Sequence, residues 1–298
     1  MAMNKITNKI TCAVCGSSQI GFHLKKNDYN FYRCRACRLI FVWPLPDNPA
    51  EIYDQDYFQG SKKKFGYVDY EKDKEAMKNI FLKYLKIIGN YVFSKNSLLL
   101  DIGAATGVFV ELANSAGFKA EGIEPSFWAA EIAGKKGLKV CQGTIETANF
   151  PRRYFDVLTL FDVFEHLKNP QISLQKMNFI LKDKDILVIN TMDSGSLWAN
   201  FWSSRWQAMA PPEHLFLYNQ ENIKNILERN GFKILKIKKI NKFFNLSYVF
   251  YIASSTLKNN FFGKFSSFFS RHSAINFSIP LIIRDNMLVI CRKFPVLK

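Results

Sequence analysis

Residues 98–107, LLLDIGAATG, decide the fold class of this chain. The apolar run at the start of this stretch predicts a buried β-strand, and Gly103 and Gly107 predict a sharp turn into a helix. Asp101 would then end the strand with its carboxylate directed into a crevice. Glu124, 23 residues further on, would end the next strand. A carboxylate at that place accepts hydrogen bonds from ribose hydroxyls, so the pattern indicates a nucleotide-type site.

The sequence after this turn alternates between strand and helix character. The expected strands are residues 97–103, 119–125, 138–144, 156–162 and 185–191, with helical segments between them. This alternation predicts an α/β protein with a doubly wound parallel sheet and helices on both faces. Ligands of such sheets bind at the carboxyl ends of the strands, so the functional residues are expected there.

Two common nucleotide-binding patterns are not met around the glycine-rich turn. Residue 105 is alanine, so the dinucleotide fingerprint GxGxxG is broken. A lysine of the phosphate-loop type does not follow the turn either. Nicotinamide and triphosphate ligands are therefore disfavoured.

Four cysteines near the start of the chain have the spacing of a structural zinc site. Cys12 with Cys15, and Cys34 with Cys37, form two CxxC pairs separated by 18 residues. Residues 19–33 alternate as in a β-hairpin, which would bring the second pair back beside the first. Four thiolates complete a tetrahedron and leave no position for a reactive water. We therefore expect a zinc ribbon whose Zn²⁺ is structural.

Composition limits the remaining classes of protein. The chain has 298 residues, enough for one large domain and one small one, or for two medium ones. Hydrophobic residues at 48% and charged residues at 22% exclude a wholly disordered or coiled-coil chain. Without a secretory signal or a long apolar run, and with only six cysteines, the chain is expected to be cytoplasmic and reduced. Cys141 and Cys291 fall in apolar runs and are expected to be small core residues.

The positive charge of the chain is concentrated near its end. Lys plus Arg exceed Asp plus Glu by 41 to 25, giving +16, and residues 231–298 hold twelve basic residues against one acid, Asp285. Such a surplus favours anionic partners, although AT-rich coding bias also produces it. Within residues 243–284, phenylalanines recur on one helical face and basic residues on another. Contact with an anionic membrane surface, packing or oligomer contact, and nucleic-acid contact all remain open for this segment.

The segments LLLDIGAATGVFVELANSAGFKAEGIEPS and FDVLTLFDVFEHLKNP together resemble the class I S-adenosylmethionine-dependent methyltransferases. The resemblance covers about residues 80–240 and the last strand, NMLVICRK. It implies a Rossmann-like, seven-stranded sheet whose last strand is antiparallel. It also implies the residues that contact S-adenosylmethionine: Asp101, Gly103, Ala104, Gly107, Glu124, Pro125, Ser126, Thr144, Ile145, Phe161 and Asp162. Ala104 stands where the family often has cysteine, a departure that matters little because the backbone makes the contact.

The wider arrangement resembles methyltransferases of polysaccharide and antibiotic-sugar biosynthesis, among them the sugar C-methyltransferases. The segments that carry this likeness are the cysteine pairs, PLPDNPAEIYDQDYF and PPEHLFLY. The expected organisation is a zinc ribbon at 1–45, a connector at 46–75 and a methyltransferase domain at 76–298. That domain would carry the basic, Phe-rich insertion at about 243–284.

Two histidines are candidates for removing a proton from the acceptor of the methyl group. Resemblance to the sugar C-methyltransferases makes His214 the first candidate base, with Glu213 as its partner. Adjacent residues usually point apart, and His214 could instead pack against the helix that begins near Asn219. His166 follows Glu165 after the fourth expected strand, where it would line the acceptor pocket or belong to the helix start.

Three functions are weighed. The leading one is methyl transfer to a small-molecule, nucleotide-sugar or glycan acceptor, by an enzyme in the cytoplasm or peripherally at the inner face of the membrane. The alternative is an rRNA or tRNA methyltransferase that binds RNA through its ribbon and basic surface, but the Asn-Pro-Pro-aromatic signature is missing. A non-catalytic binding protein is disfavoured because both Asp101 and Glu124 are present. The acceptor, its methylated atom and the oligomeric state stay open.

Overall fold

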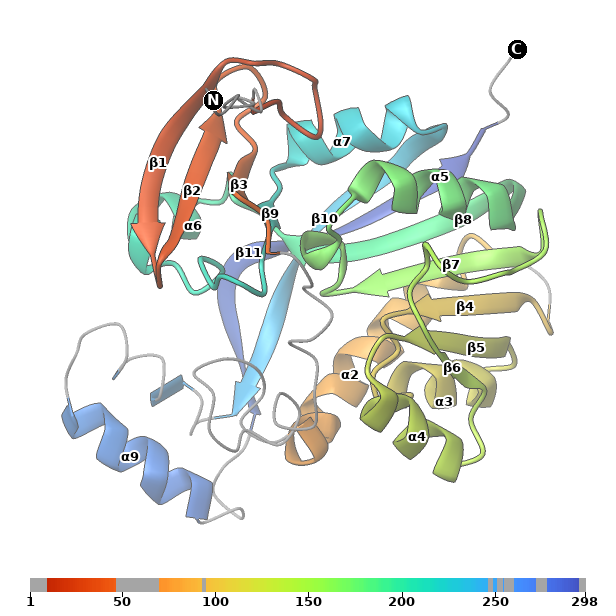
Figure 1. The fold of residues 1–298 in the computed structure, drawn as a ribbon. Coiled ribbons are helices and arrows are strands. Elements are labelled where there is room, and N and C mark those ends of the chain that lie inside the picture. The colour runs from red at the N-terminus through yellow and green to blue at the C-terminus, as the bar shows by residue number, and fades with distance from the viewer. Residues whose placement is uncertain are drawn as a thin grey trace, which may run out of the picture.

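A seven-stranded sheet lies at the centre of the molecule (Figure 1). The computed structural model describes residues 10–46, 70–92, 95–245, 249–250, 254, 260–271 and 278–294. The strands of the sheet lie in the order β10-β11-β8-β7-β4-β5-β6. Their bounds are β4 (Leu98–Ile102), β5 (Lys119–Glu124), β6 (Val140–Gln142), β7 (Phe155–Phe161), β8 (Leu181–Met192), β10 (Phe232–Asn245) and β11 (Ser278–Lys293).

The directions of the strands confirm the expected fold class. Strands β6, β5, β4, β7 and β8 pair in parallel, whereas β11 pairs antiparallel with both β8 and β10. The chain therefore has a Rossmann-like α/β sheet of seven strands whose final strand is antiparallel. Since β10 and β8 are both antiparallel to β11, they run in the same direction.

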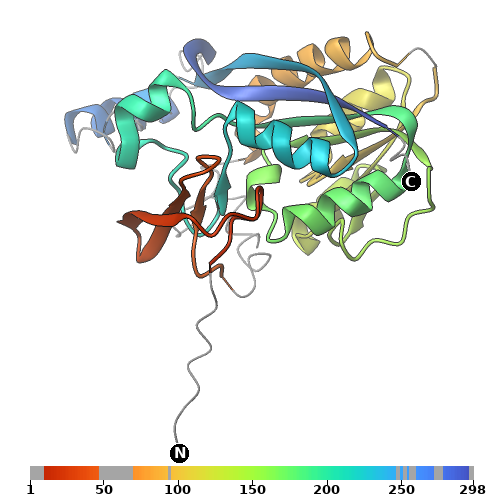
Figure 2. The same ribbon diagram turned by 90° about the horizontal axis from the view of Figure 1, so that it is seen from above.

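Helices cover both faces of the sheet because side chains along each strand alternate between two apolar cores (Figures 1 and 2). One core contains residues of α2 and α3, and the other contains residues of α5 and α7. The helices are α2 (Tyr70–Ile88), α3 (Val108–Ser115), α4 (Phe127–Lys135), α5 (Pro170–Ile180), α6 (Leu197–Trp202), α7 (Gln220–Arg229) and α9 (Asn260–Arg271). Two short 3₁₀ turns, η2 (Phe164–His166) and η3 (Ser203–Arg205), lie in the loops.

A second sheet of four strands contains the cysteine-rich start of the chain. Its order is β1-β2-β3-β9, with β1 (Ile20–Lys26), β2 (Tyr29–Cys34), β3 (Ile40–Val42) and β9 (Phe216–Leu217). The expected hairpin is confirmed: Asn27 and Asp28, both with positive φ, form a two-residue turn between β1 and β2. Strand β9 comes from the loop after β8, so the methyltransferase-like part of the chain completes the sheet of the ribbon.

Two expectations are modified by the structure, and a third concerns residues that it does not describe. Cys291 is buried, as expected, but the expectation for Cys141 is wrong because this residue is exposed. It lies on β6, which is an edge strand of the sheet. The strands on either side of the expected insertion are longer than the sequence suggested, with β10 ending at Asn245 and β11 beginning at Ser278. Residues 47–69, most of the expected connector, lie outside the described residues.

The structure offers no membrane span within the described ranges. None of the helices there is both long enough and apolar enough to cross a bilayer.

Candidate cofactor and acceptor site

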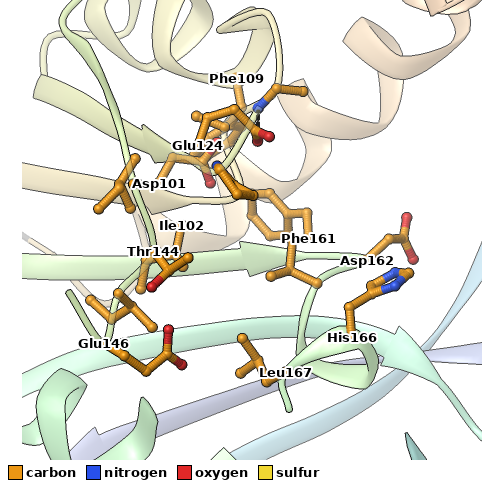
Figure 3. Close-up of a pocket in the computed structure, with 18 of the residues that line it drawn as sticks. Asp101, Ile102, Phe109, Glu124, Thr144, Glu146, Phe161, Asp162, His166 and Leu167 are labelled. Carbon is orange, nitrogen blue, oxygen red and sulfur yellow. Dashed lines mark hydrogen bonds between the residues drawn. The ribbon is translucent and has the colours of Figure 1, made fainter. Parts of the chain in front are cut away.

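A cavity of about 420 Å³ opens at the carboxyl ends of β4, β5 and β7 (Figure 3). It is lined by charged, apolar and glycine residues from the ends of four strands and the loops that follow them, and from α2 and α3: Met77, Phe81, Asp101, Ile102, Gly103, Ala104, Ala105, Phe109, Ile123, Glu124, Pro125, Gly143, Thr144, Ile145, Glu146, Phe161, Asp162, Val163, His166, Leu167, Lys168 and Asn169. Nine of the eleven residues expected to contact the donor lie in this lining. Gly107 and Ser126 do not.

Asp101 is a buried carboxyl group on β4. Its Oδ1 accepts a hydrogen bond of 2.7 Å from the hydroxyl of Thr159, which lies on the neighbouring strand β7. Burial raises the pKa of Asp101 to about 7, the Thr159 hydrogen bond opposes that rise, and the nearby charge of Glu124 adds to it. A buried carboxylate of this kind is stabilised when a ligand brings positive charge or hydrogen-bond donors to it.

Glu124 joins the end of β5 to the glycine-rich turn. Its Oε2 accepts from the backbone N–H of Ala105 at 2.9 Å, and its Oε1 accepts from the backbone N–H of Ser126 at 2.9 Å. Burial raises the pKa of Glu124 to about 7, and these two hydrogen bonds oppose the shift. The remaining lone pairs of the carboxylate can accept from a diol, as a ribose site requires.

Glycine is required at two positions of the turn, both by the backbone conformation and by the lack of room for a Cβ atom. Gly103 has φ +77°, and a Cβ there would lie 2.4 Å from Cγ2 of Val163. Gly107 has φ +81°, and a Cβ there would lie 2.5 Å from Cδ1 of Leu138. Gly107 therefore lets the turn approach its neighbours closely.

Ser126 has a different role from a ligand contact. Its hydroxyl accepts from the N–H of Ala129 and caps α4.

Aromatic rings form the apolar wall of the cavity. Phe161, Phe109 and Phe81 meet with ring centroids 4.7 to 5.6 Å apart. Phe81 and Met77 come from α2 and were not identified as site residues from the sequence, although their spacing of four residues puts them on one helical face. Glu146, Val163, Leu167, Lys168 and Asn169 were also missed, since loop residues carry no periodic signal.

The two candidate histidines lie together although 48 positions separate them. The rings of His166 and His214 have centroids 4.9 Å apart at an angle of 65°. His166 lines the cavity, on the side where Figure 3 shows it beside Asp162. His214 is not among the residues that line the cavity, although its ring neighbours that of His166.

Backbone carbonyls contact Nδ1 of both imidazoles. Nδ1 of His166 lies 2.8 Å from the carbonyl oxygen of Glu213, and Nδ1 of His214 lies 2.7 Å from that of Ala208. A carbonyl oxygen only accepts, so Nδ1 is the donor in each of these two contacts. Burial is the main reason that the pKa of His166 is lowered, which favours the neutral form of its ring.

Glu213 and Glu165 hold the histidines in ways that the sequence did not indicate. Glu213 contacts Nδ1 of His166 through its backbone carbonyl. Glu165 is buried, accepts from the hydroxyl of Thr191 at 2.8 Å through Oε2, and accepts from the N–H of Leu215 at 2.9 Å through its backbone carbonyl. The turn η2 is thus bonded directly to the segment that carries His214.

The four cysteines form one cluster. Sγ atoms of Cys12 and Cys37 lie 3.5 Å apart, as do those of Cys15 and Cys34, and all four lie within 4.8 Å of one another. A tetrahedral zinc site with Zn–S bonds of about 2.3 Å requires sulfur atoms about 3.8 Å apart. The four thiols, none of them in a disulfide, therefore fit a tetrahedral metal ion.

The cysteine cluster is bonded to the helices of the larger sheet. The carbonyl of Cys37 accepts from Nδ2 of Asn222 at 3.3 Å and from Nδ2 of Asn219 at 3.4 Å. Arg229 donates to the carbonyl of Val14 at 3.1 Å. Because β9 begins two residues after His214 and pairs with β3, the ribbon holds one side of the histidine segment.

The fold and the site define a class before any relative is considered. A seven-stranded sheet with one antiparallel strand, and acidic side chains at the ends of its first two parallel strands, is the arrangement of class I S-adenosylmethionine-dependent methyltransferases. The chain belongs to the methyltransferase domain family, which matches residues 72–237.

Comparison with individual proteins agrees with the family. A ubiquinone biosynthesis O-methyltransferase from Glaesserella parasuis is 28% identical over 123 residues, covering 38% of this chain and 51% of that protein. The chain spans between about half and two thirds of the length of the curated relatives it matches.

Two crystal structures show the same fold. A methyltransferase from Archaeoglobus fulgidus has a TM-score of 0.51 at 20% identity, over 80% of this chain and 97% of that one. Magnesium protoporphyrin IX methyltransferase from Synechocystis, solved with bound S-adenosylhomocysteine, has a TM-score of 0.50 at 11% identity, over 78% and 90%.

Proposed function

We propose that this protein transfers the methyl group of S-adenosylmethionine to a small acceptor, namely a sugar, a nucleotide-sugar or a glycan. The observation that carries the proposal is the pairing of His166 and His214 at the border of a cavity that holds Asp101 and Glu124. A donor site and a pair of basic nitrogens are then adjacent, as methyl transfer to a protonated acceptor group requires.

The residues on the donor side of the cavity suit the parts of S-adenosylmethionine. Glu124 would accept from the ribose hydroxyls, and Asp101 with the glycine-rich turn would face the amino-acid part. Thr144 and Ile145 would flank the adenine ring. When bound, S-adenosylmethionine supplies an activated methyl group on a sulfonium, and the faces of aromatic rings such as Phe161 attract positive charge.

The histidines would take the proton of the acceptor. Each has Nδ1–H donated to a carbonyl, so Nε2 would be the base. His166 lines the cavity and is the nearer of the two to the donor side; His214 would act on an acceptor that enters beside it or would orient His166. Glu213 would contribute through its carbonyl to the tautomer of His166.

Two considerations support a small acceptor. The segment around PPEHLFLY resembles the sugar C-methyltransferases. One curated relative has a name that refers to ubiquinone biosynthesis, and ubiquinone is not a nucleic acid.

We further propose that Cys12, Cys15, Cys34 and Cys37 hold a structural Zn²⁺. Four sulfur ligands leave no open coordination position, so the ion would take no part in the methyl transfer. Its contribution would be to fix the ribbon, and through β3 and β9 the segment after His214. Metal analysis of the purified protein should give about one zinc per chain, as a single four-sulfur site predicts. Zinc-free protein would contradict this part of the proposal.

The test of the function uses purified protein with radiolabelled S-adenosylmethionine. Separate reactions receive a nucleotide-sugar fraction, a glycolipid fraction and total RNA from the source cells. Label in either of the first two supports the proposal. Label confined to RNase-sensitive, acid-insoluble material would overturn it in favour of an RNA methyltransferase. Asp101→Ala together with Glu124→Ala serves as the control that should remove labelling of every fraction.

A further inference from the structure

The hairpin of β10 and β11 extends beyond the edge of the sheet at which the cavity opens. Strand β11 pairs with β8 only as far as Asn286 opposite Met192, the last residue of β8. The hairpin continues past that point, from Lys242 opposite Leu281 to Asn245 opposite Ser278. Since β10 runs in the same direction as β8, this extension lies at the carboxyl edge of the sheet, the edge that carries Asp101 and Glu124.

Helix α9 lies in the chain between these two strands and is found beyond the end of β10, away from the sheet (Figure 1). One side of the helix packs on Phe250, whose ring lies 5.4 to 6.5 Å from those of Phe262, Phe265 and Phe269. Large apolar rings are exposed next to this contact. Phe261 is 58% exposed, Phe268 48% and Phe265, at the border with Phe250, 40%, so the three form one apolar stripe.

Basic residues flank this stripe of exposed rings. Lys264 lies three residues after Phe261, and Arg271 lies three residues after Phe268, so both are neighbours of the stripe on the helix surface. Both are exposed. The helix contains no acidic residue, and residues 231–298 have twelve basic residues against one acid, Asp285, which is buried.

We propose that α9 binds the surface of an anionic lipid bilayer. Phe261, Phe265 and Phe268 would insert among the acyl chains, and Lys264 and Arg271 would extend to lipid phosphates. The charge of the helix decides between this partner and a second copy of the chain, because pairing α9 with itself would bring like charges together. Nucleic acid is disfavoured because its surface is charged and hydrated. The three exposed phenylalanine rings are stabilised most when they leave water for an apolar phase such as the lipid interior.

Binding in this way would hold the cavity edge of the sheet toward the membrane. This step rests on the proposed function, because it selects among its acceptors. A methyltransferase whose cavity edge faces a bilayer is suited to a sugar or glycan carried on a lipid. The acceptor class that follows is a membrane-bound glycolipid.

Sedimentation with vesicles tests the membrane contact without using catalysis. The full-length protein is mixed with vesicles of phosphatidylcholine alone or with phosphatidylglycerol added. We expect clear binding to the anionic vesicles, weaker binding to the neutral ones, and loss of binding at high salt. Phe261→Ser with Phe268→Ser should weaken partitioning to anionic vesicles about tenfold or more, because two inserted rings are lost. Both rings are about half exposed, so α9 should remain folded.

Matched variants distinguish the effect of this surface from that of removing exposed rings or charges elsewhere on the protein. Phe22→Ser with Phe127→Ser removes two rings that are 63% and 65% exposed elsewhere, and should leave vesicle binding unchanged. Lys264→Gln with Arg271→Gln should reduce binding to anionic vesicles alone, whereas Lys135→Gln with Lys224→Gln should not. Circular dichroism checks the fold, and titration with S-adenosylmethionine checks the donor site of every variant.

Several outcomes would overturn the proposal. These are equal binding by the Phe261/Phe268 variant and the unchanged protein, no binding to anionic vesicles, a dimer that the variant converts to monomer, or binding to RNA that the variant abolishes. Failure of vesicle binding with normal affinity for S-adenosylmethionine would overturn the membrane contact and leave the proposed function intact. Absence of methyl transfer with normal vesicle binding would overturn the proposed function and leave the membrane contact intact.

Discussion

Asp101 is a carboxyl group whose burial has an energetic cost that depends on pH. Its pKa in the folded protein is raised to about 7, above the ordinary value of 3.8. The folded state therefore binds this proton more tightly than the unfolded state does. The resulting contribution to the free energy of unfolding is fully present below pH 3.8 and is lost as the pH rises through 7. The same carboxylate is what a cationic donor would need.

We expect Asp101→Asn to stabilise the ligand-free protein at high pH. The variant keeps an oxygen that accepts from Thr159 but has no charge to bury. Its free energy of unfolding should exceed that of the unchanged protein by about 2–4 kcal/mol at pH 8, and the difference should shrink toward zero as the pH falls to 4. Denaturant unfolding across this pH range measures it. A difference that does not vary with pH would contradict the buried-charge explanation.

The same substitution should weaken donor binding. Asp101→Asn removes the negative charge expected to face the amino-acid part of S-adenosylmethionine, so calorimetric titration should show at least a tenfold loss of affinity, which is about 1.4 kcal/mol. Thr159→Val, which removes the hydroxyl partner of Asp101 but keeps the carboxylate, is the matched control. It should lose less affinity than Asp101→Asn.

The histidine pair predicts a pH dependence of methyl transfer. Burial lowers the pKa of His166, so its basic form persists below the ordinary value of 6.5, and activity should fall only at a pH under that value. His166→Asn and His214→Asn each keep a donor for the backbone carbonyl but remove Nε2. The variant that lacks the base should lose about 10²- to 10⁴-fold in kcat with little change in donor affinity. If both variants keep full activity, neither histidine is the base.

Strands and helices with a regular apolar pattern could be predicted from the sequence, whereas one short strand could not. The five parallel strands and the hairpin of the ribbon have runs or alternation that depend on local residues alone. Strand β9 has two residues, and its pairing with β3 depends on a segment about 175 positions earlier in the chain. The contact between His166 and His214 depends on this arrangement, so each histidine was a candidate but their pairing was not foreseeable.

Two other differences have similar causes. Cys141 follows an apolar residue and resembles a core position, but β6 is an edge strand, and edge position is a property of the sheet order. Glu213 was expected as the partner of His214, and its contact with His166 was not foreseen. Its contact with His166 is made by the backbone, which every residue type has.

The start of α7 offers a test of how the ribbon is held. Asn222 is fully buried, donates to the carbonyl of Cys37 at 3.3 Å and accepts from the N–H of Asn219 at 2.9 Å. Asn222→Ala leaves both groups without this partner and should cost about 1–3 kcal/mol of stability. Denaturant unfolding measures the loss. Asn200→Ala, at an exposed site on α6, should change stability by less than about 0.5 kcal/mol.

At the scale of the whole molecule, the ribbon and the methyltransferase domain share one apolar core. Cys12, Cys34 and Cys37 belong to the same buried cluster as residues of β7, α5 and α7. Metal binding and the fold of the larger sheet are therefore coupled, since an ion that binds only the folded state stabilises it.

Removing the proposed zinc should separate acceptor chemistry from donor binding. Chelation should lower the unfolding temperature and reduce methyl transfer, because the segment after His214 loses its support from β3. Affinity for S-adenosylmethionine should change little, because Asp101 and Glu124 lie on β4 and β5. Readdition of Zn²⁺ should restore both properties. If chelation abolished donor binding, or left methyl transfer unchanged, the assigned role of the ribbon would be wrong.

The pairing of β3 with β9 also bears on how the chain is synthesised. The first three strands of the ribbon sheet leave the ribosome early, but residues 216–217, which pair with Ile40 and Phe41, follow only after most of the larger sheet has been made. Until then the edge of β3 lacks its neighbour, and an unpaired edge is a site for wrong association. The sheet of the ribbon is therefore completed only after residues 216–217 have been made, and a chain truncated before residue 216 would keep that edge unpaired.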